Sequence, residues 1–207
     1  MREQLPRAED ELNATFKVAS EDVFALLKRR QNESNNATDR RALVRSIFAF
    51  VESMLFAMKQ EILKAPQGFT LGEFTLLRDE SYELADNGEV RAKTAKLTLK
   101  SNLKFTFASW AKATGTTCKL DLSENGWQKF QAAVRVRDRL MHPKRATDLE
   151  VSDNEIEGAT AAFFWFHTTF AVSMSQVVIA TIQHLKATGE WDDMRPANEE
   201  DGTISPA

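Results

Sequence analysis

The amino-acid sequence predicts an all-α fold, a bundle of about five to seven helices with one small β-hairpin. Apolar residues recur at intervals of three and four over most of the chain, the period of a helix that buries one face. Two capping boxes, Thr70-Leu-Gly-Glu73 and Ser152-Asp-Asn-Glu155, mark helix starts. A tight-turn signature, Asp86-Asn-Gly88, places the hairpin near residues 81–93.

The helices are expected in a simple order along the chain. Two short helices, the second capped by Ser20, are predicted in the first region, and Pro66 and Gly68 end the helix that follows it. Gly115 ends another helix, and Ser123 and Pro143 bound the next. The predicted helical segments are residues 8–31, 39–63, 70–78, 97–113, 123–142 and a long final helix after Ser152.

Composition limits the classes of protein that the chain can represent. Its 207 residues, with a formal net charge of -3, predict one soluble helical domain at 1–189. The segment 190–207 is rich in acidic residues and proline, which predicts an acidic disordered tail. Cys118 is the single cysteine, which excludes an internal disulfide and a four-cysteine zinc site. No apolar stretch follows the charged N-terminus, so we expect a cytoplasmic protein without a secretory signal.

One segment has two interpretations. No formally charged residue occurs from Gly158 to Leu185, a length sufficient to cross a bilayer. The run contains many threonine, serine, glutamine and histidine residues, which are costly in lipid. A long helix buried at the centre of a bundle or against a partner is therefore preferred to a membrane span.

The helix before Pro143 places an arginine on its apolar side. Trp127, Phe130, Val134 and Met141 fall within an arc of about 60°, and Arg137 lies beside that arc. A guanidinium at such a position requires an acid partner or an anion to hold. Two interpretations stay open: an internal ion pair, with Glu52 as the candidate partner, or an anion site.

His142 follows Arg137 by five residues and precedes a proline, so it closes the same helix. If the helix continued through His142, the two side chains would point about 140° apart. A two-fold pairing of subunits can bring an arginine and a histidine from each chain into one cleft. Dimerisation is therefore part of the expectation.

The segment Arg137-Asp-Arg-Leu-Met-His-Pro143 resembles the Arg-polar-x3-His motif of HEPN domains, which usually has asparagine in the second place. The amphipathic helix with Phe-Val-Glu52, the turn at 86–88 and the capped final helix agree with that family, over roughly residues 10–187.

The resemblance implies an all-α homodimer and, in many members, metal-independent endoribonuclease activity in toxin–antitoxin, defence or RNA-processing systems. Other members bind a partner protein or a nucleotide without cleavage. Arg137 would hold the scissile phosphate and His142 would transfer protons, without metal or cofactor. Asp138 replaces the usual asparagine and can orient a histidine or pair with an arginine. Lys144 stands where some members carry a modified tyrosine.

Four further cations, Arg135, Arg139, Lys144 and Arg145, surround the motif and are candidates for binding the RNA backbone. The alternative, for Arg135 and Arg139, is that they only form the solvent-exposed face of a helix and do not bind RNA. The aromatic run at 163–166 is expected in the core or at a dimer interface, and no acids or cysteines accompany His167 and His184 to form a metal site. The expected partners are a second copy, RNA, and an antitoxin or regulatory protein, with no membrane.

Overall fold

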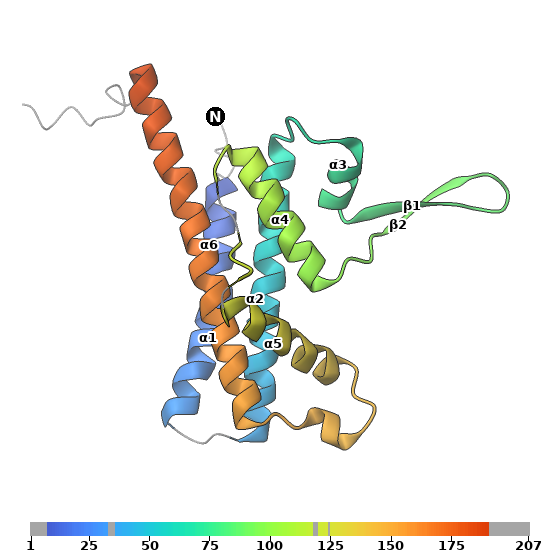
Figure 1. The fold of residues 1–207 in the computed structure, drawn as a ribbon, viewed down its shortest axis with the longest axis vertical. Helices are drawn as coiled ribbons and strands as arrows, with labels where there is room; N and C mark the ends of the chain where they lie inside the picture. The colour runs from blue at the N-terminus through green and yellow to red at the C-terminus, as the bar shows by residue number, and fades with distance from the viewer. Residues whose placement is uncertain (1–7, 33–35, 118–119, 124, 191–207) are drawn as a thin grey trace, which may run out of the picture.

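The computed structural model describes residues 8–32, 36–117, 120–123 and 125–190, and it has the predicted all-α architecture with a small hairpin. The elements, shown in Figure 1, are α1 (Ala8–Asn32), α2 (Ala37–Lys64), α3 (Leu71–Leu77), β1 (Glu80–Leu84), β2 (Val90–Thr94), α4 (Leu99–Thr114), α5 (Asn125–Met141), the 3-10 turn η1 (Ala146–Leu149) and α6 (Asp153–Thr188). All but one residue of the predicted tail at 190–207 lies outside the described residues.

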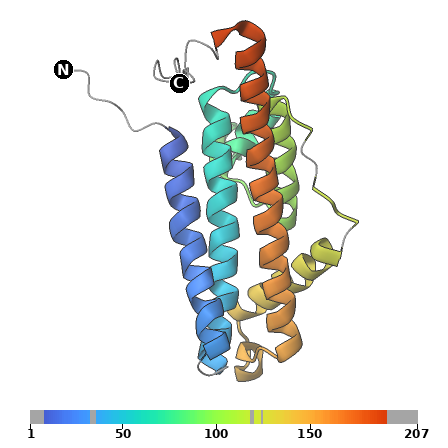
Figure 2. The ribbon, with the colours of Figure 1, turned by 90° about the vertical axis from the view of Figure 1, so that its left-hand side faces the viewer.

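Three long helices form the body of the molecule. Figures 1 and 2 show α1, α2 and α6 side by side along the long axis, with α5 inclined across the lower half. The rings of Phe50 and Phe166 meet edge to face with centroids 5.8 Å apart, and Phe107 adds a third ring from α4. Because these rings are fully buried, they join α2, α4 and α6 in one core.

The first helix differs from the prediction. The segment expected to form two short helices is one continuous helix, α1. Ser20 does not cap a second helix, because its hydroxyl donates to the Lys17 carbonyl 3.0 Å away within α1. Val23 is fully buried a turn later, so packing continues through the position where a break was expected.

The local signals for helix ends are confirmed elsewhere. Both capping boxes form: Thr70 with Glu73 begins α3, and Ser152 with Glu155 begins α6. The Thr70 backbone hydrogen bond and the Lys112 ammonium lower the pKa of Glu73 to about 2. Gly115 ends α4 in the left-handed conformation, with φ of 64°.

The hairpin is an arm that extends from the bundle, as Figure 1 shows. Its strands are antiparallel, with Leu84 opposite Val90 beside the predicted turn. An ion pair anchors its base: the Lys59 ammonium of α2, with 1% of the side chain exposed, lies 2.5 Å from the Asp79 carboxylate. This ion pair joins residues 20 positions apart, and no periodicity in the sequence indicates it.

The last helix packs against the core with one side only. Phe163, Phe166 and Phe170 are buried, but Phe164 is half-exposed. Among the described residues, α6 is the one helix long and apolar enough to span a membrane by length and composition, and 28% of its most apolar window is buried. Of the two expected positions, the centre of the bundle is therefore wrong for the outer side of α6, and burial of that side against a partner stays a prediction.

Candidate functional site

The position of α5 is set by a close aromatic contact with α6. Trp127 and Phe130 of α5 stack with centroids 5.7 Å apart, and Trp165 of α6 lies 5.5 Å from Phe130. A Cβ atom on Gly126 would lie 2.1 Å from the Trp165 ring, so this position has room only for glycine. The first turn of α5 is thereby fixed against α6, and its last turn carries the candidate site.

The apolar side of α5 is close to the one predicted from the sequence. Trp127, Phe130 and Val134 are buried as expected. Met141, which was expected on the same side, is half-exposed because the helix ends at this residue. Leu140, the preceding residue, takes the buried place at the end of the helix.

Arg137 lies at the edge of the buried side, where both of its terminal nitrogens have acid partners. Nη2 donates to the Glu52 carboxylate of α2, and Nη1 donates to Asp138 Oδ1 at 3.0 Å. The exposed fractions are 25% for Arg137 and 45% for Glu52, so the pair is partly open to solvent. A guanidinium has five donor hydrogens, which leaves donors for another acceptor. The Glu52 partner inferred from the sequence is thus present, and the guanidinium keeps unused donors.

His142 lies just past the end of α5 and is exposed. Its backbone N–H donates to the Asp138 carbonyl at 3.1 Å, which completes the last turn before Pro143. Because α5 ends at Met141, the 140° separation of an unbroken helix does not govern the His142 side chain. Within the described ranges, the imidazole has no hydrogen bond or ion pair, so it is accessible from solvent.

Of the two roles considered for Asp138, the structure has the pairing with an arginine. Its carboxylate contacts Arg137, while its carbonyl accepts the His142 amide. The carboxylate and the guanidinium partly neutralise each other. The negative charge of Asp138, which would repel a phosphate, is therefore reduced but not removed.

An arginine from α2, which the motif did not indicate, reaches the end of α5. Arg45 Nη2 lies 3.5 Å from the Leu140 carbonyl, two residues before His142. Arg41, one turn earlier, donates to the Leu149 carbonyl at 3.4 Å. The available sequence signal was the spacing of Arg41 and Arg45, which places both on the side of α2 that also carries Glu52.

The predicted RNA-binding residues do not form one patch. Arg139 is held by the Glu155 carboxylate at 2.8 Å and by the Glu150 carbonyl at 2.9 Å, which gives it a structural role. Arg135 lies about 200° around α5 from Arg137 and lines a hollow beside α6. Lys144 and Arg145 are exposed in the loop after His142. Apart from Arg139, the cations near His142 are therefore Lys144 and Arg145 in the following loop and Arg45 of α2, which contacts the Leu140 carbonyl.

The other histidine of interest is part of the packing between α1 and α6. His167 lies among Phe16, Phe24 and Phe50, with ring centroids 5.1 to 6.1 Å away, and burial lowers its pKa. In the part of the chain that the structure describes, no group of three histidine, cysteine or acidic residues is arranged to hold a metal ion.

The site therefore combines an accessible imidazole, a guanidinium with spare donors, and loop cations at one end of the bundle. This set has groups of the kinds that can hold a phosphate and transfer protons. Comparison of the chain with family models, with curated proteins and with solved structures finds no match.

Proposed function

We propose that this chain is a metal-independent endoribonuclease of HEPN type, acting as a toxin or defence protein. The observation that supports the proposal is the exposed His142 at the end of α5, with Arg137 oriented by Glu52 and Asp138 in the same last turns. An arginine oriented by carboxylates is prepared to meet a phosphate with its remaining donors.

The proposed reaction is attack by the ribose 2′-hydroxyl on the adjacent phosphorus. His142 removes the hydroxyl proton as the bond from the 2′-oxygen to phosphorus forms. The bond to the 5′-oxygen breaks, and a protonated histidine supplies the proton that this oxygen takes up. Arg137 stabilises the charge on the non-bridging oxygens. The products are a 2′,3′-cyclic phosphate and a 5′-hydroxyl, and DNA, which lacks the nucleophile, is not cut.

The proposal includes a homodimer in which a second copy faces the site. A second His142 would supply the acid while the first acts as the base. Mixing wild-type protein with an excess of the His142→Ala variant tests this arrangement, because a mixed dimer keeps only one of the two histidines. A fall in activity per wild-type chain supports a cleft shared between subunits, and unchanged activity per wild-type chain contradicts it.

The direct test is cleavage of a panel of single-stranded and hairpin RNAs in the presence of EDTA. Cleavage that survives the chelator, is lost in His142→Ala and leaves cyclic phosphate ends is the expected result. A matched substrate with one 2′-deoxy nucleotide at the cut site should resist. Failure to bind or cut any RNA in a broad panel contradicts the proposal.

A second candidate function is a non-catalytic HEPN module that binds a partner protein or a nucleotide. The Arg137–Glu52 pair favours it, because a guanidinium already paired with two acids is less available to a substrate. Both partners of that pair are partly exposed, so its loss should cost at most about 1 kcal/mol. Stable binding of a nucleotide or protein without cleavage would identify this alternative.

A further inference from the structure

The outer side of α6 is exposed and uncharged. From Gly158 to Leu185 the helix has no charged residue, although exposed helix faces usually carry charges. Seven of the exposed residues lie within an arc of about 100° around the helix. These residues, here called the outer face of α6, are Ala161, Phe164, Thr168, Ala171, Val172, Ser175 and Ile179. An exposed apolar surface of this kind marks an interaction site.

We propose that a second copy of this chain covers the outer face of α6, with the two α6 helices antiparallel about a two-fold axis beside residues 169 and 170. In a two-fold contact, residue i of the first chain meets residue j of the second, and residue j of the first chain meets residue i of the second. This axis pairs Phe164 with Ser175, and it brings Ile179 within one residue's rise of Ala161. Each large side chain thus meets a small one, which allows close helix packing.

The charges that bound the outer face agree with the antiparallel direction. Glu157 precedes the face and Lys186 follows it, at opposite ends of the helix. Antiparallel pairing brings Glu157 of one chain about one helical turn from Lys186 of the other. A parallel pair would place like charges together and align the helix dipoles unfavourably.

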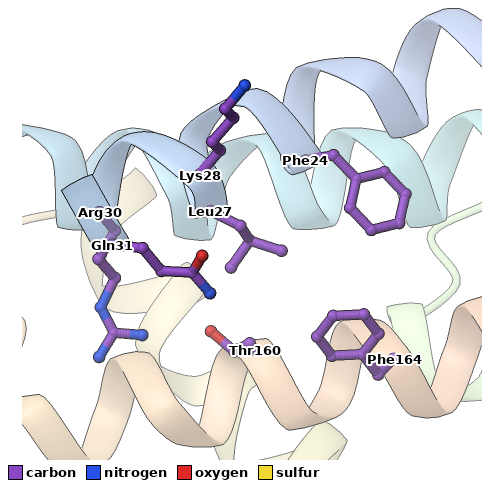
Figure 3. A pocket seen from close by; sticks show the side chains of 7 residues that line it. All are labelled: Phe24, Leu27, Lys28, Arg30, Gln31, Thr160 and Phe164. Atoms are coloured by element: carbon purple, nitrogen blue, oxygen red, sulfur yellow. The ribbon is translucent and has the colours of Figure 1, made fainter.

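The surface beside the outer face provides a place for a partner side chain. A hollow of about 720 Å³ lies between α1 and α6. Figure 3 shows that Phe24 and Leu27 of α1 face Thr160 and Phe164 of α6 across it. In the proposed pairing, Val178 of the partner subunit lies level with Thr160 and on the α1 side of the helix. Val178 is 57% exposed, so this branched side chain is available to enter the hollow.

The contact through α6 is independent of the proposed cleavage. The two-fold axis lies about 25 Å along the helix from the first turn of α6, which follows the loop carrying His142. The two Arg137–His142 sites are therefore placed toward opposite ends of the α6 pair. The cleft shared between subunits in the proposed function therefore uses a different contact surface, and the two contacts together make a tetramer from which Thr168→Arg releases a dimer.

Disulfide cross-linking tests the direction and register of the pair. In a chain with Cys118→Ser, the double variant Phe164→Cys and Ser175→Cys should form a covalent dimer on mild oxidation. Each single variant should stay uncross-linked, because the equivalent residues of an antiparallel pair lie about 16 Å apart along the axis. Cross-linking of either single variant, or no cross-linking of the double variant, overturns the proposal.

Assembly in solution gives a second test with a matched control. Thr168→Arg places a cation near the two-fold axis, whereas Thr181→Arg makes the same change at an exposed threonine about 140° around the helix. We expect light scattering to give half the wild-type molar mass for Thr168→Arg and an unchanged mass for Thr181→Arg. Equal masses for both variants, a monomeric wild type, or flotation of a monomer with phosphatidylcholine vesicles overturns the proposal.

Discussion

The end of α5 and the outer face of α6 are both exposed, but they differ in how their side chains are held. At the end of α5, ion pairs and carbonyl contacts fix Arg137, Arg139 and Arg45. On the outer face of α6, Phe164, Val172 and Ile179 meet solvent with no charged residue among them. Substitutions at the first region should therefore change chemistry, and those at the second should change association.

The largest expected effect is on cleavage at the end of α5. His142→Ala should lower the cleavage rate by about 100-fold or more, the usual contribution of a general acid–base group. Its thermal unfolding should be unchanged, because the exposed imidazole makes no hydrogen bond or ion pair within the described residues. Gel-based cleavage and circular dichroism measure the two quantities. Unchanged cleavage would remove His142 from the mechanism.

The next effect concerns the packing that joins the two regions. Gly126→Ala should destabilise the fold by about 1–3 kcal/mol, because the new Cβ overlaps the Trp165 ring. Gly158→Ala is the control, since its Cβ would lie 4.0 Å from Lys129 Cδ and alanine favours a helix. Urea denaturation measures both free energies of unfolding. Equal effects would show that Trp165 does not restrict α5.

A smaller effect is expected at the acid partner of Arg137. Glu52→Gln should change the free energy of unfolding by less than about 1 kcal/mol, because the pair is partly exposed. RNA binding should strengthen, since one carboxylate beside the guanidinium is lost. Glu61→Gln, on the same helix and paired with Lys64, is the control for charge alone. Equal gains in both variants, measured by fluorescence anisotropy, would argue against a role for the pair.

The smallest effect is a pH dependence at His167, between α1 and α6. Burial lowers the pKa of His167 below 6.5, so the unfolded chain binds the proton more readily than the folded one. Stability should be complete above pH 6.5 and should fall as the pH drops below that value. His167→Phe should reduce this fall. An unchanged pH profile of thermal unfolding would mean that other groups cause it.

Much of the fold could be predicted because its signals are local. The capping boxes at Thr70 and Ser152, the turn at residues 86–88 and the glycine after α4 each depend on a few neighbouring residues. The two-helix prediction for residues 8–31 failed because Ser20 can satisfy its hydroxyl within a helix as well as at its start.

The candidate site was predicted in part. Helical periodicity placed Arg137 at the edge of the apolar side and suggested Glu52 as its partner, and both are found there. Periodicity could not show that Arg139 is paired with Glu155 and is therefore not available to bind RNA. It also gave no reason to bring Arg45 to the end of α5, because that contact spans 95 residues.

The sequence by itself determined which segments are helical, where most of them end and which residues compose the Arg-Asp-x3-His segment. These properties follow from neighbours within a turn or two of the chain. The tertiary structure decided that Lys59 is buried against Asp79, that Arg45 meets the end of α5 and that the outer face of α6 stays exposed. Each of these features depends on which helices pack together. That packing is determined by the fit between helix surfaces whose residues lie far apart in the sequence.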